Sequence, residues 1–244
     1  MASQDQLIKP KVEDFNGVEW TPLKLTLVEY PKDDLLGKIL AFSSLSPLGI
    51  GAGFVALILF RRDLHTIVFF IGTILNELLN QILKTIICDP RPIFRNMQHN
   101  DYGMPSSHAQ FSWFFTTYVI YFVFIRLHHM NNNTTLESVW KAVIVLGCVF
   151  LAIIVSVSRI YLQYHTWKQV FCGALLGILF GTIWFALTYL VFTPYFPVVV
   201  SWRISELLLL RDTTLIPNVL WFEYTNTRQE ARARGRKLVS MKSQ

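Results

Sequence analysis

Three short clusters of basic, hydroxyl and imidazole side chains could carry chemistry in this sequence. Lysine offers phosphate oxygens a point charge, and arginine offers them a planar fork of donors. A histidine beside such cations suits a general acid or base. We therefore expect a site for a multiply charged anion. The clusters are Lys84 followed after six residues by Arg91-Pro92, then Pro105-Ser106-Ser107-His108, and last Ser158-Arg159 followed after five residues by His165.

Two of these clusters stand where helices are predicted to begin. Ser107 to Gln110 reads S-x-x-Q and Thr166 to Gln169 reads T-x-x-Q, and both are capping-box patterns. With Ser107 as N-cap, the free N–H groups of the first helical turn would face the preceding loop. Such N–H groups bind anions. His108 falls in that first turn, which favours an acid or base there over a structural histidine.

The segments that must position these clusters are membrane spans. The 244 residues are 52% hydrophobic and only 16% charged, which argues against disorder and nucleic-acid binding. Residues 39–60, 66–87, 108–127, 139–157 and 170–192 are long and apolar enough to cross a bilayer as helices. Residues 196–210 are expected to form an interfacial or re-entrant helix, and a short sixth crossing is the alternative. We predict an all-α, polytopic membrane bundle.

The charge distribution predicts how this bundle is oriented. An N-terminal segment (1–38), a catalytic bundle (39–192) and an interfacial helix with a basic tail (193–244) are expected. The first segment holds five Lys and seven Asp or Glu, whereas residues from Ser201 onward hold eight Lys or Arg and four Asp or Glu. The positive-inside rule then makes the C-terminus cytosolic. Five crossings place the N-terminus and all three clusters on the opposite, extracytoplasmic face.

A polar stripe is predicted on the second span. Glu77, Gln81 and Lys84 are spaced by four and three residues, and those offsets share one helical face. We expect the stripe to lead into the anion site. The alternative is a buried stripe that joins one helix to another.

The three clusters resemble the K-x6-R-P, P-S-G-H and S-R-x5-H motifs of the type 2 phosphatidic acid phosphatase superfamily, with Ser107 in place of the glycine. Residues 102–108, 161–167 and 215–224 are similar, more narrowly, to the eukaryotic dolichyldiphosphatases. The resemblance implies a multi-pass enzyme of the endoplasmic reticulum membrane. Such an enzyme hydrolyses dolichyl diphosphate to dolichyl phosphate and inorganic phosphate on the lumenal side, which recycles the carrier for protein N-glycosylation. A broader phosphatase for phosphatidate or sphingoid phosphates, and a catalytically silent lipid-binding scaffold, are the alternatives.

The resemblance also implies roles for individual residues. His165 would attack the terminal phosphorus and form a phosphohistidine, and His108 would protonate the leaving oxygen. The partners would be a polyisoprenoid diphosphate lipid and the bilayer, with no nucleic acid. No metal or other cofactor is expected, because no cluster of Asp or Glu on this face looks like a magnesium site. The phosphate-binding set would be Lys84, Arg91, Ser106, Ser107 and Arg159.

One position departs from the superfamily pattern. An aspartate usually follows the third-motif histidine by four residues, and this chain has Gln169 there. A carboxylate would orient the imidazole and stabilise its positive form. Gln169 either orients His165 as a neutral amide or serves only its capping box. Glu77 is a candidate replacement carboxylate.

The predicted orientation can be tested at two N-glycosylation sequons, Asn132-Asn133-Thr134 and Asn133-Thr134-Thr135. We expect both to stay unmodified in the endoplasmic reticulum, because they lie in the connector between the third and fourth spans, on the cytosolic face. Val18→Thr completes a sequon at Asn16 in the N-terminal segment and serves as the positive control. Asn16 should then gain a glycan that endoglycosidase H removes. Glycan on the native connector, with none at Asn16, would mean that the orientation is the reverse of the predicted one and that the active site faces the cytosol.

Overall fold

The computed structural model describes residues 20–23, 28–92, 102–126, 135–216 and 219–242. The N-terminal segment up to residue 19 and the connector 127–134, with Asn132 and Asn133, lie outside the described residues. The elements in chain order are β1 (Trp20–Pro22), β2 (Glu29–Pro31), α1 (Leu35–Ser43), α2 (Ser46–Arg61), α3 (Leu64–Ile87), α4 (Ser107–Tyr121), the π-helical η1 (Phe122–Arg126), α5 (Thr135–Tyr161), α6 (Trp167–Leu187), η3 (Thr188–Phe192), η4 (Thr193–Tyr195), α7 (Phe196–Val200), α8 (Arg203–Leu208) and α9 (Val219–Lys242).

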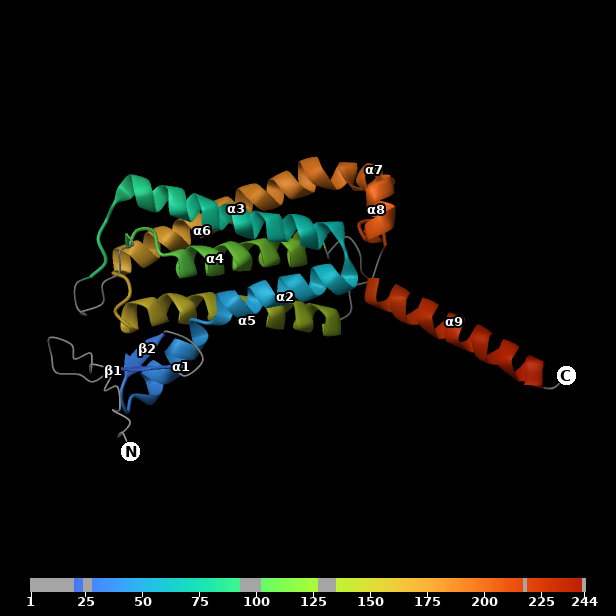
Figure 1. Ribbon diagram of the computed structural model, residues 1–244, viewed down its shortest axis with the longest axis horizontal. Coiled ribbons are helices and arrows are strands. Elements are labelled where there is room, and N and C mark those ends of the chain that lie inside the picture. The colour runs from blue at the N-terminus through green and yellow to red at the C-terminus, as the bar shows by residue number, and fades with distance from the viewer. Residues whose placement is uncertain (1–19, 24–27, 93–101, 127–134, 217–218, 243–244) are drawn as a thin grey trace, which may run out of the picture.

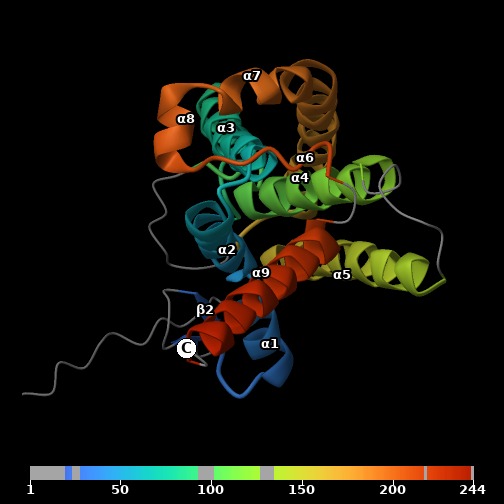
Figure 2. The ribbon, with the colours of Figure 1, turned by 90° about the vertical axis from the view of Figure 1, so that its right-hand side faces the viewer.

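The bundle consists of helices that lie side by side, namely α2, α3, α4, α5 and α6 (Figure 1). Four helical segments are long and apolar enough to cross a membrane: Leu35–Arg61, Leu64–Ile87, Ser138–Tyr161 and Trp167–Val200. The fifth predicted span, 108–127, is α4 continued by η1. It contacts α2, α3, α5 and α6, and Figure 2 shows it among them. Because protein rather than lipid surrounds α4, its sequence can be less apolar than that of its neighbours.

The outer surface of the bundle is apolar and its interior holds polar groups. On α3, Leu78, Ile82 and Ile86 are exposed, whereas Asn80 and Lys84 are buried. A soluble protein rarely exposes so much contiguous apolar surface. A lipid environment explains the pattern, since polar side chains within a membrane turn toward the bundle interior. The all-α, polytopic membrane architecture predicted from the sequence is therefore confirmed.

The closest helix packing joins α4 to α6 through three glycines spaced by four residues. A Cβ atom on Gly173 would lie 2.6 Å from the carbonyl oxygen of Ser106, and one on Gly181 would lie 3.1 Å from that of Phe114. A Cβ on Gly177 would meet the carbonyl oxygen of Gln110. Small residues at this spacing let two membrane helices approach backbone to backbone. The α4–α6 contact therefore depends on the missing side chains.

Residues 196–210 do not form a single helix long enough to cross a bilayer. They form α7 and α8, which turn across one end of the bundle (Figure 1). Immediately afterwards, the amide of Arg211 donates to the carbonyl of Arg62 at 2.9 Å, and the amide of Leu64 donates to the carbonyl of Arg211 at 3.0 Å. The segment thus begins where α6 and its continuation end and returns to the α2–α3 turn at the same end of the bundle, as expected for an interfacial or re-entrant segment.

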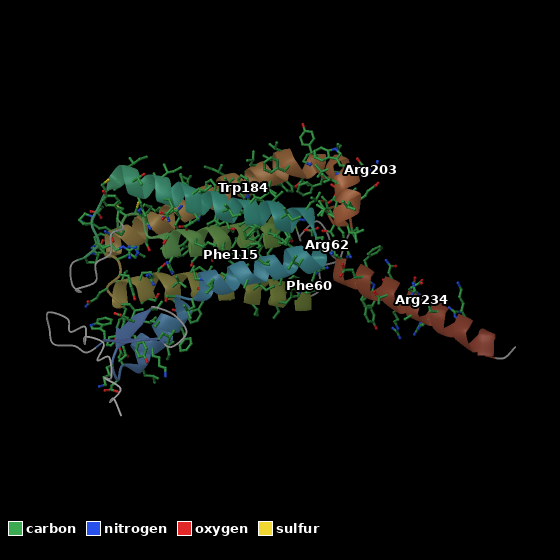
Figure 3. All side chains as sticks on the ribbon, viewed as in Figure 1. Phe60, Arg62, Phe115, Trp184, Arg203 and Arg234 are labelled. Atoms are coloured by element: carbon green, nitrogen blue, oxygen red, sulfur yellow. The ribbon has the colours of Figure 1, made fainter. Side chains whose placement is uncertain are left out.

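The two ends of the bundle differ in what they carry. The β1–β2 hairpin and α1 lie at one end, together with the end of α3 and the starts of α4 and α6 (Figure 1). The turn at Arg62, the α8 residue Arg203 and the α9 residue Arg234 lie toward the other (Figure 3). All three sequence clusters are at the hairpin end.

Gly177→Ala should disrupt the α4–α6 contact. The added methyl would meet the carbonyl oxygen of Gln110 and lie 2.9 Å from the amide nitrogen of Phe114, both of them backbone atoms. Overpacking of this kind costs about 1–3 kcal/mol. We expect a lower midpoint of thermal unfolding in detergent and a lower yield of monodisperse protein. Gly147→Ala on α5, where a Cβ meets nothing within 4 Å, is the matched control. Equal midpoints for the two variants would contradict this packing argument.

Candidate active site

The structure brings the predicted basic and imidazole side chains to one end of the bundle. Lys84 is in the last turn of α3, Arg159 is in the last turn of α5, and His165 lies between α5 and α6, all three less than a tenth exposed. His108 is in the first turn of α4 and within electrostatic range of Lys84 and Arg159. Arg91, in the loop after α3, is half-buried, and its positive charge lies within electrostatic range of both histidines. Three helices and two loops therefore supply one cationic site.

The hydrogen bonds of His165 determine which ring nitrogen carries the proton. Its Nδ1 lies 2.9 Å from the carbonyl oxygen of Gly103 and 3.3 Å from Oε1 of Gln169. A carbonyl can only accept, so Nδ1 is the donor and carries the hydrogen. In the neutral ring, Nε2 then keeps its lone pair. A nucleophilic histidine needs such a lone pair.

The surroundings of His165 also favour its neutral form. Burial, followed by the positive charges of Arg159 and Arg91, lowers the pKa of His165 to about 3. Burial disfavours the charged form of an imidazole, and nearby cations do the same. The ring is therefore uncharged at neutral pH.

Arg159 is held from two sides. Its backbone carbonyl accepts from the amides of Tyr164 and His165, both at 3.1 Å, and its guanidinium lies over the Tyr164 ring at 4.2 Å. The Tyr164 hydroxyl in turn accepts from the amide of Glu29 in the hairpin. Nε and Nη1 of Arg159 are buried without a hydrogen-bond partner among the described residues. Buried unpaired donors on a cation are costly, and an anionic ligand would satisfy them.

The start of α4 differs from the prediction. The N-cap is Ser106 rather than Ser107, and no side chain caps it. Gln110 does not complete a capping box. Its amide donates to Oδ1 and the backbone carbonyl of Asn76, both at 3.0 Å, and accepts from Asn80 at 2.8 Å. Gln110 faces α3 across a buried interface, where these bonds satisfy its own amide, which has no access to water. Nδ2 of Asn76 and Oδ1 of Asn80 are buried without a hydrogen-bond partner among the described residues.

Ser106 and Ser107 nevertheless lie where the prediction needs them. The amide of Ser106 donates to the carbonyl of Gln169 at 3.2 Å, which ties the start of α4 to the start of α6. The Ser106 hydroxyl is buried and has no hydrogen-bond partner among the described residues. Ser107 is half-buried as the first residue of α4. Both remain candidates for phosphate binding.

The predicted polar stripe on α3 is confirmed only in part, because Lys84 is buried and Glu77 is half-buried, but Gln81 is exposed. The buried polar residues are Asn76, Asn80 and Lys84, each four residues from the next. Gln81 is exposed, and its amide donates to the carboxylate of Glu77 at 2.7 Å along the exposed side of α3. A shift of one residue turns a side chain by about 100° around a helix. Glu77 bonds to Gln81 on its own helix. Within the described residues, no hydrogen bond joins Glu77 to His165 or Gln169.

Gln169 makes the contacts that both of the roles left open by the sequence would need. The capping box with Thr166 is present, since each side chain bonds the other's backbone amide. The same Oε1 also faces Nδ1 of His165. A carboxylate that sequence reasoning missed, Asp89, accepts from Nε2 of Gln169 at 2.7 Å. Its position two residues before Arg91 was the available signal.

The described part of the chain contains no group of three or more His, Cys, Asp or Glu side chains that could hold a metal ion. The three cysteines are free thiols.

The structure is a membrane helix bundle that gathers two histidines and three cations at one end, as a membrane enzyme for phosphate esters or anhydrides would need. Residues 65–192 match the PAP2 superfamily. "Dolichyldiphosphatase 1" from Rhinolophus ferrumequinum is 52% identical over 90% of this chain and 93% of its own. The chain therefore belongs to the PAP2 superfamily and, within it, to the dolichyldiphosphatase family.

A more distant relative and a solved structure show how far this similarity extends. "Lipid phosphate phosphatase gamma" from Arabidopsis thaliana is 39% identical over 84% of this chain and 89% of its own. The crystal structure of a transmembrane PAP2-type phosphatidylglycerolphosphate phosphatase from Bacillus subtilis superposes with a TM-score of 0.52. It covers 66% of this chain and 80% of the bacterial one at 22% identity. That likeness shows a shared fold.

Proposed function

We propose that this chain hydrolyses dolichyl diphosphate to dolichyl phosphate and inorganic phosphate. The single observation that carries the mechanism is the neutral, buried imidazole of His165, whose Nδ1 is held by Gly103 and Gln169 beside the unpaired donors of Arg159. Family membership supports the substrate. The polyisoprenoid tail would lie in the bilayer along the apolar outer surface of the bundle, with the diphosphate at the cationic end.

The first step forms a covalent intermediate. Nε2 of His165 attacks the terminal phosphorus and a P–N bond forms. The bond from that phosphorus to the bridging oxygen breaks, and His108 donates a proton to the departing dolichyl phosphate. Lys84, Arg91 and Arg159 stabilise the charge on the non-bridging oxygens, which is where positive groups lower the barrier of phosphoryl transfer.

The second step releases the enzyme. His108, now neutral, takes a proton from water, and the resulting nucleophile attacks the phosphorus of the phosphohistidine. The P–N bond breaks, inorganic phosphate leaves, and His165 regains its lone pair on Nε2 while His108 is again protonated. Backbone N–H groups at the start of α4, near Ser106 and Ser107, would bind the phosphate in both steps.

We place the site on the lumenal face of the endoplasmic reticulum membrane, with α9 in the cytosol. The basic residues of α9 and the acidic N-terminal segment support this orientation under the positive-inside rule. Residues 1–38 would then be a lumenal segment, 39–192 the catalytic bundle, and 193–244 an interfacial helix and basic cytosolic tail. Recycling of the glycan carrier for protein N-glycosylation follows from that location.

A broader lipid phosphatase that acts on phosphatidate or sphingoid phosphates is the second candidate. The Arabidopsis relative, named as a lipid phosphate phosphatase, favours it. The same cations and the same histidines would serve a phosphate monoester.

A comparison of substrates tests the function directly. Purified protein in detergent is assayed with dolichyl diphosphate, dolichyl phosphate and phosphatidate by release of inorganic phosphate. We expect dolichyl diphosphate to react fastest, and we expect EDTA to leave the rate unchanged because basic side chains supply the positive charge. Preference for phosphatidate would favour the second candidate. No release from any of the three would favour a silent scaffold.

Single alanine substitutions of the two histidines should impair different parts of the reaction. His165→Ala removes the nucleophile, so no phosphoenzyme should form from substrate labelled in the terminal phosphate. His108→Ala should still form phosphoenzyme but slow both steps by about 10²- to 10⁴-fold, the usual contribution of a general acid or base. Its effect should shrink for a substrate with a better leaving group. A fully active His165→Ala protein, with the thermal midpoint of the unmodified chain, would rule out this mechanism.

A further inference from the structure

The side-chain amide of Gln169 lies between His165 and a carboxylate. Oε1 accepts from the amide of Thr166 at 3.2 Å and faces Nδ1 of His165 at 3.3 Å. Nε2 donates to Oδ2 of Asp89 at 2.7 Å and to the carbonyl of Pro90 at 2.9 Å. A backbone amide can only donate and a backbone carbonyl can only accept. Thr166 and Pro90 therefore establish which end of the amide is oxygen.

Asp89 is joined to His165 by a second route. The amide of Gly103 donates to the backbone carbonyl of Asp89 at 2.7 Å, and the carbonyl of Gly103 accepts from Nδ1 of His165 at 2.9 Å. The four residues close a ring of hydrogen bonds. A Cβ on Gly103 would lie 2.6 Å from Nε2 of Gln169, so the glycine lets the backbone pass directly over the amide.

The sequence places a neutral amide where the superfamily pattern has an aspartate, and the structure supplies a carboxylate one hydrogen bond further away. We propose that Asp89 is a positioning residue for His165 that acts through Gln169. This inference rests on the proposed function, because it assigns Asp89 a part in the same phosphoryl transfer.

The physical basis is charge transmitted through an oriented amide. When Nε2 of His165 bonds to phosphorus, the imidazole ring becomes positive. A carboxylate on Nε2 of Gln169 polarises that amide and makes its oxygen a stronger acceptor for Nδ1–H. Gln169 keeps the carboxylate away from the ring itself, so His165 stays neutral and nucleophilic before the substrate arrives.

The test separates the charge of Asp89 from its shape. Asp89→Asn keeps the size and an oxygen that can accept from Gln169, and removes only the charge. We expect kcat for dolichyl diphosphate to fall about tenfold or more, as when outer groups behind a functional histidine are removed. KM should stay within about twofold, since Asp89 bonds Gln169 and is not among the proposed phosphate-binding groups. Asp33→Asn makes the same change on an exposed turn at the same end of the bundle and should have no effect.

Gln169→Glu supplies the second arm. Glutamate preserves the capping box with Thr166, but it sets a carboxylate against Oδ2 of Asp89 where a 2.7 Å bond had been. We expect this variant to lose activity. The double variant Asp89→Asn/Gln169→Glu restores a donor at position 89 opposite the carboxylate and moves the negative charge next to His165. Both variants lose the bond to the Pro90 carbonyl equally, so their difference reports on position 89. It should recover at least about tenfold over Gln169→Glu alone.

The pH profile gives a readout that a purely structural role would not move. In the double variant a carboxylate bonds directly to Nδ1 of His165 and raises its pKa, so the acidic limb of kcat/KM should shift to higher pH. Wild-type kcat in Asp89→Asn, or no recovery and no shift in a folded double variant, would overturn the inference. If Asp89→Asn alone is unstable, the test is the comparison of Gln169→Glu with the double variant Asp89→Asn/Gln169→Glu. Failure of the unmodified chain on every substrate would instead reject the proposed function.

Discussion

The close approach of α4 to α6 is the contact on which the rest of the site depends. Gly173, Gly177 and Gly181 remove the side chains that would hold the two backbones apart. That approach allows the amide of Ser106 to donate to the carbonyl of Gln169. The helix start that carries His108 therefore lies beside the one that follows His165. A membrane supplies little hydrophobic drive between helices, so this packing rests on van der Waals contact and hydrogen bonds.

Buried polar groups at the cationic end serve two purposes. The amide of Gln110 bonds those of Asn76 and Asn80 and so joins α4 to α3, which sets Lys84 toward the interior. Arg159 instead keeps buried donors without hydrogen-bond partners among the residues described. The bonds between the amides stabilise the contact of α3 with α4, whereas the unpaired donors of Arg159 are costly in the protein alone. An anionic substrate offsets that cost, which links the stability of this region to its chemistry.

Local patterns in the sequence were sufficient for much of the architecture and part of the site. Hydropathy located the membrane helices, because a spanning segment must be long, apolar and internally hydrogen-bonded. The parity of those spans then brought Lys84, Arg159 and His165 to one end. The capping box of Thr166 and Gln169 was also predictable, since it needs only residues three positions apart. Each of these features depends on residues that are close together in the sequence or on the number of spans between the motifs.

Contacts between helices were decided by the tertiary structure alone. Gln110 matched a capping box as well as Gln169 did, yet it bonds to α3, because a buried amide takes the partners that the facing helix offers. Glu77 and Lys84 are almost two helical turns apart, and only the packing of α3 shows which of them faces the interior. Asp89 reaches Gln169 across eighty positions of sequence, and no periodicity encodes that contact. The sequence determined the spans, the motifs and their common end, and the packing decided which polar groups meet there.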